Sequence, residues 1–280
     1  MRTPRQPTVT LIGLGLMGGS IALDVKKSGW RVFGVGRPET LLKARRRRMI
    51  DAGFPYAHID AAVAGADLII LCVPIGRILE LLPKVLRAAK PGAVVTDVGG
   101  TKEKIVALAR RHCPRQVTFI GGHPIAGTEH HGIESAQLGL FRGQPWILAT
   151  PLRKTPPIYR RLLRDLDAAP FHLTPKSHDE IYARVSHLPH LIAFTMMNQL
   201  SVKEAKTLKA FAGPTYRGMT RVAGSPAANW VDTVLSQGAG LDRAIREFEL
   251  SWKKMKAAMK KNGGREFFTA AAKRRIALME

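Results

Sequence analysis

The feature that most constrains the fold is a glycine-rich turn between an apolar run and an expected helix. Residues 8–12 read TVTLI, residues 13–18 read GLGLMG, and a helix is expected over 19–27. The pattern Gly-x-Gly-x-x-Gly between a strand and a helix is the fingerprint of a dinucleotide-binding βαβ unit. The start of this chain is therefore predicted to bind a dinucleotide.

The residues of this turn have separate expected roles. Gly13 permits the tight turn, Gly15 lets the backbone approach a pyrophosphate, and Gly18 lets the helix pack closely on the strand. Free N–H groups at the helix start favour the phosphate anion. Leu16 and Met17 lie between these glycines and are expected to contact the cofactor with them.

The end of the second strand bears on which dinucleotide is bound. An NAD enzyme places an Asp or Glu there for the ribose 2′-hydroxyl, whereas the strand over 31–35 is followed by Gly36 and Arg37. A missing carboxylate and a present guanidinium both favour a 2′-phosphate, and four arginines over 45–48 follow on the next helix. NADP is the favoured cofactor. The alternative is that Arg37 stacks on adenine and NAD is accepted.

Further apolar runs alternate with helical segments up to about residue 150. The run over 67–73 is apolar as in parallel strands buried on both faces, and it ends at Val73 and Pro74 beside the expected cofactor site. More strands are expected over 93–97 and 145–149. This alternation predicts an α/β fold with a Rossmann-type, doubly wound parallel sheet.

The pattern changes after residue 151 and becomes almost entirely helical. We expect a dinucleotide-binding Rossmann domain over 1–152 and an all-helical substrate-binding and dimerisation domain over 153–280. The last long helix carries an apolar seam made of Leu241, Ile245, Phe248, Trp252, Met255 and Met259. Such a seam favours core or subunit contact over a ligand site. Because the sheet domain has its own core, the helical half is expected to form a homodimer.

One imidazole stands out among small residues after the run over 117–120. Residues 121–129 read GGHPIAGTE, which puts His123 at the carboxyl edge of the expected sheet, where open α/β folds bind ligands. Because imidazole titrates near neutral pH, His123 is a candidate general base for an alcohol. The alternative is a loop histidine with a structural hydrogen bond.

Polar residues also share one face of an apolar helix expected over 177–200. Asp179, Ser186 and His190 are separated by seven and four residues, which places them on one side of the helix. They form either a satisfied core network or the wall of a site. Pro189 within the segment implies a kink or a break.

Positive charge is abundant, and one arginine is a candidate ligand for a carboxylate. The formal net charge is +23, with basic residues spread along the chain. Without a recognised nucleic-acid motif, solvated basic helix faces are favoured over nucleic-acid binding, and attraction of an anionic substrate is a secondary benefit. Arg221 lies among small residues in TRVAGSPAANW (220–230), where its planar fork suits a carboxylate.

The sequence gives no sign of a membrane segment or of a metal site. No apolar run approaches the roughly 20 residues that span a bilayer, and the first residues lack the apolar region of a signal peptide. A cytoplasmic protein is expected. The two cysteines, Cys72 and Cys113, show no metal-ligand spacing, so no metal is expected.

Four motifs in this order resemble those of the prephenate/arogenate (cyclohexadienyl) dehydrogenases of tyrosine biosynthesis: GLGLMG, GGHPIAGTE, SHLPH (186–190) and TRVAGSPAANW. The resemblance runs from about residue 8 to about residue 260. It implies oxidative decarboxylation of prephenate, a small anionic cyclohexadienyl substrate, to 4-hydroxyphenylpyruvate. Hydride leaves the carbinol carbon for the nicotinamide of NADP or NAD, and the ring carboxylate leaves as carbon dioxide.

The resemblance also implies roles for individual residues. His123 matches the family's histidine that accepts the hydroxyl proton, and Arg221 matches the arginine that binds a substrate carboxylate. His190 lies where the family contacts the side chain of the substrate. Ser186 and His187 match residues that line the same pocket.

Further matches concern the mouth of the pocket and the support of the histidine. Thr128, Glu129 and Asp179 match positions near the pocket mouth, where acidic groups can gate the site by pairing with the clamp arginine. Relatives often have a serine that supports the catalytic histidine where this sequence has Gly100. Thr101, also an expected cofactor contact, or a water is the expected substitute.

Three other functions compete with this interpretation. Arogenate is the alternative substrate, although His190 is not acidic, and an acidic residue there would favour the arogenate ammonium. A β-hydroxyacid dehydrogenase or imine reductase also joins a sheet domain to a helical one, but GGHPIAGTE and SHLPH argue against it. A basic binding protein with a vestigial nucleotide fold would bind nucleic acid in a salt-sensitive way.

Overall fold

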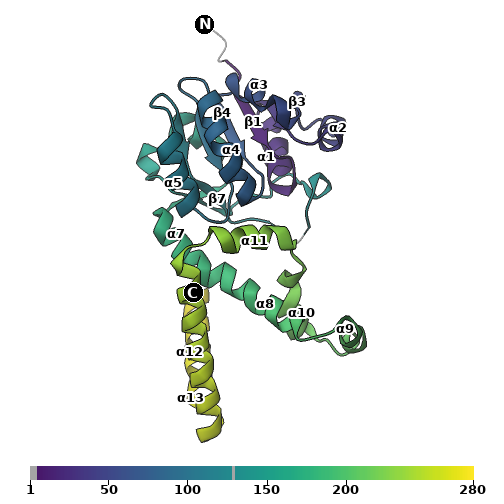
Figure 1. Cartoon of the computed structure of the whole chain (residues 1–280), viewed down its shortest axis with the longest axis vertical. Coiled ribbons are helices and arrows are strands. Elements are labelled where there is room, and N and C mark those ends of the chain that lie inside the picture. The colour runs from purple at the N-terminus through teal and green to yellow at the C-terminus, as the bar shows by residue number, and fades with distance from the viewer. Residues whose placement is uncertain (1–4, 128–129) are drawn as a thin grey trace.

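A six-stranded parallel sheet forms the first half of the computed structural model, which describes residues 5–127 and 130–280 (Figure 1). Its strands are β1 (Thr8–Ile12), β2 (Arg31–Val35), β3 (Ala52–Phe54), β4 (Leu68–Leu71), β5 (Val94–Asp97) and β6 (Thr118–Ile120). The strand order is β3-β2-β1-β4-β5-β6, and every neighbouring pair is parallel. This confirms the predicted Rossmann-type sheet, with its order reversing between β1 and β4.

Helices cover both faces of this sheet. They are α1 (Leu16–Lys27), α2 (Pro38–Arg46), α3 (Ile59–Ala64), α4 (Ile75–Ala88) and α5 (Glu103–His112). Because strand side chains alternate, Val9 and Leu11 of β1 enter one apolar cluster with α1, whereas Ile12 enters the other with α3, α4 and α5. Both faces are therefore buried, as the continuous apolar runs require.

A second, three-stranded sheet carries the histidine of the GGHPIAGTE motif. It consists of β7 (Gly122–Pro124), β8 (Pro145–Leu148) and β9 (Ala169–His172), with β7 antiparallel to β8 and β8 parallel to β9. The strand expected over 145–149 therefore exists but does not belong to the parallel sheet. After β6 the chain leaves that sheet, and Gly122 passes close to the end of β5, where a Cβ would lie 2.6 Å from the Asp97 carbonyl oxygen.

Helix α6 (Pro157–Asp165) and strand β9 pack with the sheet half of the molecule. Tyr159 and Leu162 lie in the same apolar cluster as Trp30 and Trp146, and Trp146 Nε1 donates to the Tyr159 hydroxyl at 3.1 Å. We therefore propose that the domain boundary lies near residue 174 rather than at the predicted 152/153. The helical pattern of α6 does not reveal which half it packs against.

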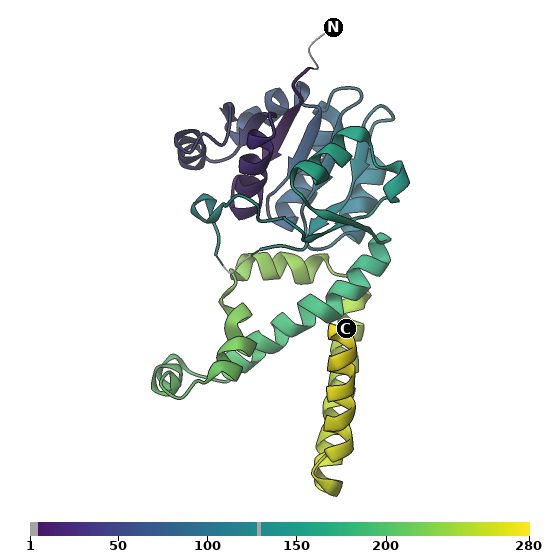
Figure 2. The same ribbon diagram turned by 180° about the vertical axis from the view of Figure 1, so that it is seen from behind.

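The remaining helices form the second half of the molecule. They are α7 (Pro175–Tyr182), α8 (Leu188–Asn198), α9 (Val202–Leu208), α10 (Pro214–Thr220), α11 (Ala227–Ser236), α12 (Ala239–Asn262) and α13 (Arg265–Met279). α11 lies between the sheet and α8, and α12 and α13 form a hairpin that projects away from the sheet (Figures 1 and 2). Within the described residues, no helix combines the length and apolar character that crossing a membrane requires.

The expected kink at Pro189 takes the form of a π turn over Ala183–His187, between α7 and α8. A π turn holds one residue more than an α turn, so it rotates the residues after it relative to those before it. As a result His187, and not Ser186, comes next to Asp179. Gln237 Nε2 bridges the two, at 2.5 Å from His187 Nδ1 and 3.3 Å from the Asp179 carbonyl. The predicted shared face of Asp179 and Ser186 is therefore wrong.

Candidate active site

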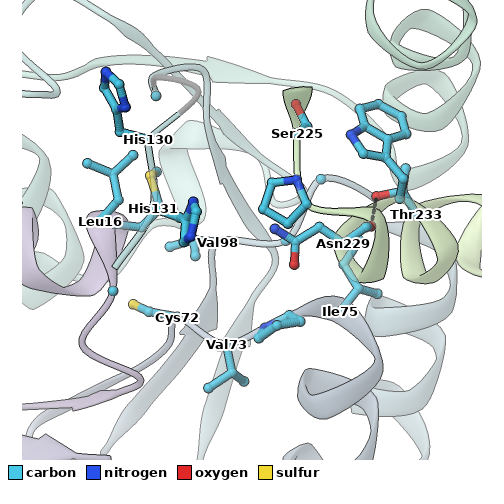
Figure 3. Close-up of a pocket in the computed structure, with 18 of the residues that line it drawn as sticks. Leu16, Cys72, Val73, Ile75, Val98, His130, His131, Ser225, Asn229 and Thr233 are labelled. Carbon is cyan, nitrogen blue, oxygen red and sulfur yellow. Dashed lines mark hydrogen bonds between the residues drawn. The ribbon is translucent and has the colours of Figure 1, made fainter. Parts of the chain in front are cut away.

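A cavity of about 510 Å³ lies where the carboxyl ends of the parallel strands meet the helical half (Figure 3). Residues of the loops after β1, β4, β5 and β7 line it, together with residues of α8, of α11 and of the segment directly before α11. The cavity lies beside the point where the strand order reverses between β1 and β4. Doubly wound folds bind their ligands at this place.

The glycine-rich turn forms the β1 side of the cavity. Gly13 has φ +97°, which suits the tight turn, and a Cβ at Gly18 would lie 2.0 Å from the Gly13 carbonyl oxygen, so only glycine allows this close packing. A Cβ at Gly15 would meet no atom within 4 Å. The space beside Gly15 is open to a ligand.

The start of α1 suits the pyrophosphate of a dinucleotide. Gly15 is the N-cap of α1 and has no side chain to cap its first N–H groups. Four other expected cofactor contacts, Leu16, Met17, Val73 and Pro74, line the cavity next to it. An uncapped helix start that faces an open cavity favours a bound anion. The residues present therefore fit a dinucleotide.

Arg37 lies outside this cavity. Its side chain is 75% exposed at the N-cap of α2, and Nε is 3.7 Å from Oε1 of Glu39. The arginine that follows α2, Arg47, serves the structure instead, because its guanidinium donates to the carbonyls of Ile133 and Ala136. At least one of the basic residues over 45–48 therefore stabilises the segment around residues 133–136.

His123 of β7 is tied down by one ring nitrogen. Its Nδ1 lies 2.8 Å from His178 Nε2, and the Tyr182 ring packs against it at 4.9 Å between centroids. Its Nε2 lies on the other side, 4.0 Å from where a Cβ of Gly100 would be. Gly100 lines the cavity, and His123 lies directly behind it without lining the cavity itself. Burial, together with the charges of neighbouring groups, holds the pKa of His123 well below its usual value. His123 is therefore neutral at neutral pH.

A buried ion pair fixes the loops around this histidine. Asp97 accepts from Lys102 Nζ, from the Gly99 backbone N–H at 2.8 Å and from the Gly122 backbone N–H at 3.2 Å. Both charged side chains are fully buried. One carboxylate thus joins the cavity-lining loop after β5 to the strand that carries His123, which fixes their relative position.

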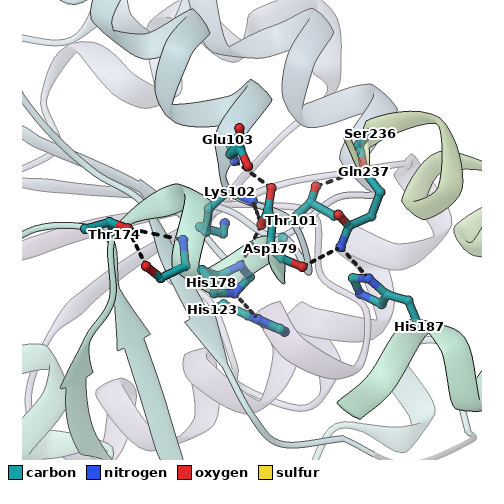
Figure 4. A network of polar contacts seen from close by, with 12 residues as sticks. Thr101, Lys102, Glu103, His123, Thr174, His178, Asp179, His187, Ser236 and Gln237 are labelled. Atoms are coloured by element: carbon teal, nitrogen blue, oxygen red, sulfur yellow. Dashed lines mark hydrogen bonds and ion pairs between the residues drawn. The ribbon is translucent and has the colours of Figure 1, made fainter. Parts of the chain in front are cut away.

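Asp179 lies in a buried network and not at the pocket mouth (Figure 4). Its Oδ1 accepts from the Lys102 backbone N–H at 2.7 Å and its Oδ2 from the Glu103 backbone N–H at 2.9 Å, so Asp179 caps the start of α5. His178 Nδ1 lies 2.7 Å from the same Oδ1. The gating role expected for Asp179 does not fit this burial, because the side chain cannot reach an exposed arginine from here.

Thr101, one of the expected supports of His123, has its hydroxyl hydrogen-bonded to a different partner. Its hydroxyl is buried and donates to the Ser236 hydroxyl at 2.8 Å, so it joins the sheet half to α11 (Figure 4). Thr101 also does not line the cavity, contrary to the expected cofactor contact. Gly100 leaves open space next to His123, and His178 supplies the hydrogen bond that holds the ring.

His190 and His187 have different surroundings. His190 lines the cavity, stacks on Trp230 at 4.0 Å between centroids, and donates from Nδ1 to the Ser186 carbonyl at 2.8 Å. Its side chain contributes Nε2 as an acceptor. His187 is buried, and this burial lowers its pKa to about 4. His187 and Ser186 therefore support the cavity wall and do not line it.

The remaining predicted residues lie at or beyond the edge of the cavity. Arg221 is exposed at the end of α10, and burial together with its charge lowers the pKa of His190, so the two lie near one another. Thr128 and Glu129 lie outside the described residues.

Sequence reasoning missed several residues of this site. His178 and Tyr182 contact the His123 ring, and Trp230 and Asn229 line the cavity. Trp230 and Asn229 end the motif that contains Arg221, and His178 directly precedes Asp179. This proximity in sequence was the available signal.

Comparison with known proteins assigns a family to both halves of the chain. The family model for the nucleotide-binding domain of prephenate dehydrogenase matches residues 21–176, and the model for its dimerization domain matches residues 174–273. Prephenate dehydrogenase of Lactococcus lactis subsp. cremoris is 36% identical over 234 residues, which cover 81% of this chain. The match covers 64% of that relative, so this chain spans less than two thirds of its length.

Two solved structures resemble this chain over nearly its whole length. Prephenate dehydrogenase of A. aeolicus, in complex with hydroxyphenyl propionate and NAD⁺, has a TM-score of 0.86 at 28% identity, covering 99% of this chain and 100% of that one. Arogenate dehydrogenase of Synechocystis has a TM-score of 0.78 at 26% identity, covering 97% and 99%. With both halves matched in order and the cavity lying between them, the chain belongs to the prephenate dehydrogenase family.

Proposed function

We propose that this chain is a prephenate dehydrogenase that converts prephenate to 4-hydroxyphenylpyruvate in tyrosine biosynthesis. The observation that carries the proposal is the orientation of His123, whose Nδ1 is bonded to His178 while its Nε2 faces Gly100 at the cavity wall. A neutral imidazole whose second nitrogen lies beside a cavity-lining glycine suits a general base. The family membership supports the same reaction.

In this reaction His123 accepts the proton of the ring hydroxyl. The O–H bond breaks as an N–H bond forms at Nε2, while the C–H bond of the carbinol carbon breaks. A nicotinamide dinucleotide at the glycine-rich turn supplies the acceptor for that hydride. The ring carboxylate then leaves as carbon dioxide, and the electrons of its bond to the ring complete the aromatic system. The proton held by His123 returns to the ring oxygen, which becomes the phenol hydroxyl.

The cavity wall supports prephenate over arogenate. Prephenate carries two carboxylates and a keto group. We assign Arg221 to one of the carboxylates and His190 to the side chain that carries the keto group. Among the described residues that line the cavity there is no Asp or Glu. The ammonium of arogenate would therefore meet no counter-charge from them, which disfavours it.

Arogenate is the second candidate, and the orientation of His190 favours it. Because Nδ1 of His190 donates to the Ser186 carbonyl, Nε2 of the neutral ring is an acceptor. An ammonium donates to such a nitrogen, whereas a keto oxygen does not. The arogenate dehydrogenase of Synechocystis, a structural neighbour at 26% identity, is consistent with this alternative.

We further propose that the enzyme favours NADP and also accepts NAD. Two observations support this preference: the strand β2 ends without a carboxylate, and the exposed Arg37 guanidinium lies at the start of α2, 3.7 Å from Glu39. The NAD⁺ bound to the A. aeolicus relative supports acceptance of NAD. The helical half, which matches a dimerization domain, is proposed to pair with a second copy.

Removing the Arg37 side chain tests the cofactor preference. In Arg37→Ala we expect the KM for NADP to rise about 10-fold or more, because a charge-assisted hydrogen bond contributes about 1.5–3 kcal/mol. The KM for NAD should change little. Arg46→Ala, which removes the same charge from the last turn of α2, is the matched control. An unchanged KM for NADP would show that Arg37 does not contact the 2′-phosphate.

Steady-state turnover of the purified protein tests the function as a whole. Prephenate and arogenate are each combined with NAD and NADP, and reduced nicotinamide is followed by its absorbance. We expect the highest kcat/KM with prephenate and NADP. Higher turnover of arogenate would support the second candidate. No turnover in any of the four combinations, together with activity on a panel of β-hydroxyacids, would overturn the proposal.

A further inference from the structure

We propose that His178 and Asp179 form a positioning pair that holds His123 as its Nδ1–H tautomer, with Nε2 left as the proton acceptor. This inference rests on the proposed function for its catalytic meaning, but the tautomer itself is a property of the free protein. The pair lies on α7, in the helical half, whereas His123 lies on β7 of the sheet half (Figure 4). The helical half would therefore prepare the base as well as cover the cavity.

The chain of hydrogen bonds ends in an acceptor, the Asp179 carboxylate. Its two carboxylate oxygens accept from the backbone N–H groups of Lys102 and Glu103, at 2.7 and 2.9 Å. Both oxygens of this carboxylate therefore act as acceptors toward the start of α5. The third contact, His178 Nδ1 at 2.7 Å, must therefore be a donor.

The next step fixes the second nitrogen of His178. Burial lowers the pKa of His178, so the ring is neutral and carries a single N–H, which is the one at Nδ1. Nε2 of His178 then has a lone pair. Because it lies 2.8 Å from His123 Nδ1, that atom of His123 must be the donor.

The last step fixes His123. A neutral His123 that carries its proton on Nδ1 has a lone pair on Nε2, the nitrogen near Gly100 at the cavity wall. The other tautomer would set two lone pairs against one another at 2.8 Å. The Tyr182 ring packs on both imidazoles, at 4.9 and 4.5 Å between centroids, and this packing opposes a ring flip.

The same arrangement favours the charge that forms during the reaction. When Nε2 takes the hydroxyl proton, His123 becomes an imidazolium whose Nδ1–H still donates to His178, which in turn donates to the Asp179 carboxylate. Asp179 offsets this positive charge without being protonated. Gly100 offers no side chain on the other side of the ring, so the support comes from α7.

The tautomer is tested directly by long-range ¹H–¹⁵N NMR spectra of the histidine rings in the free protein near pH 7.5. Comparison with His123→Asn assigns the His123 signals. We expect a protonated Nδ1 and an unprotonated Nε2 in the wild type. A wild-type His123 protonated on Nε2 would overturn the inference, whether or not the protein turns over prephenate.

Two variants of His178 test the consequence. In His178→Leu we expect kcat to fall by on the order of 10²-fold with a much smaller change in KM, because His123 can then adopt the wrong tautomer. In His178→Gln the amide oxygen can accept from Nδ1–H, and kcat should recover to within about 10-fold of wild type. His112→Leu, on the exposed end of α5, should change neither kcat nor the His123 spectrum.

The outcomes separate this inference from the proposed function. Wild-type kcat and an unchanged His123 tautomer in His178→Leu would show that the pair does not position the base. An inactive wild type would count against the proposed function and would leave the NMR result as the test of the pair. A His178→Gln variant as inactive as His178→Leu, with the Nδ1–H tautomer retained, would contradict tautomer control as the cause.

Discussion

Burial holds four histidines around the cavity in their neutral form. The pKa values of His123, His178, His187 and His190 are all lowered, in each case chiefly by burial. A neutral imidazole offers one donor and one acceptor, so each ring can be oriented by a partner on one nitrogen and can act with the other. The same shifts make the folded state sensitive to acid, because the unfolded histidines bind protons more readily.

His187 should account for a large share of the stability that is lost at acid pH. Its pKa is about 4 in the folded protein and 6.5 when unperturbed, so stability is complete above about pH 6.5 and is lost as the pH falls toward 4. We expect His187 to account for a loss of about 3 kcal/mol in the free energy of unfolding by pH 4. Urea unfolding across this range measures it.

His187→Asn and His112→Asn are the matched variants for that experiment. The amide introduced by His187→Asn offers an acceptor to Gln237 and does not titrate, so this variant should lose less stability on acidification than wild type. The exposed His112 should contribute nothing. Parallel pH profiles for wild type and His187→Asn would contradict the assigned pKa shift.

Single residues differ in how well the sequence predicts them. Gly13, Gly18 and His123 belong to short local motifs, and the structure places them where those motifs predict. The partnership of His178 with His123 joins residues 55 apart, and no periodicity within one element reveals it. The Thr101 hydroxyl donates to Ser236, which is still more distant in sequence. The sequence therefore could not predict this partner of Thr101.

At the scale of elements, the helical half holds the sheet half by capping its helices. Asp179 of α7 caps α5, and Asp232 of α11 accepts from the Gly76 backbone N–H at the start of α4 at 2.8 Å. A Cβ at Gly76 would lie 2.9 Å from Asp232, so a larger residue there would have to displace this carboxylate. Both caps lie beside the cavity, so they also fix its walls.

Removing the cap on α4 should loosen α11 and the cavity wall that it carries. For Asp232→Ala we expect the free energy of unfolding to fall by about 0.5–2 kcal/mol, as for other lost N-caps, and the KM for prephenate to rise. Asp232→Asn keeps an acceptor oxygen and should recover most of both. Urea unfolding and steady-state kinetics measure these effects. Equal behaviour of the two variants and wild type would show that the contact is incidental.

Elements that depend on segments distant in sequence are the ones that the sequence does not predict. β7 and β9 have three and four residues and are stabilised by pairing with β8, which lies far from each in sequence. The π turn over Ala183–His187 is predicted only as a kink or break at Pro189. By contrast, β1, β4 and α1 have long apolar patterns that predict both their type and their place in the sheet.

At the scale of the molecule, the helical half leaves large apolar side chains exposed on the single chain. Trp252 and Met259 of the α12 seam are each 52% exposed, whereas Leu241 at its start is buried. The seam thus begins in the core and ends on the projecting hairpin (Figure 2). Exposed apolar surface of this kind favours contact with a second copy.

Charge placed in this seam should disrupt the proposed dimer. We expect wild-type protein to have twice the chain mass by light scattering and Trp252→Glu to shift toward the monomer, because a buried unpaired carboxylate is costly at an interface. Lys253→Glu makes the larger change in charge at a neighbouring exposed position and should leave the dimer intact. A dimeric Trp252→Glu would show that this face is not the interface.

Nε2 of His123, the nitrogen beside the cavity-lining Gly100, is the proposed proton acceptor, and its removal is the most direct test. His123→Asn keeps a donor near His178 but has no base, so kcat for prephenate should fall by on the order of 10²–10⁴-fold. Cofactor affinity, measured by the fluorescence of bound reduced dinucleotide, should stay within about 3-fold of wild type because the glycine-rich turn is untouched. Turnover near the wild-type rate with intact cofactor binding would contradict the assignment of His123 as the base.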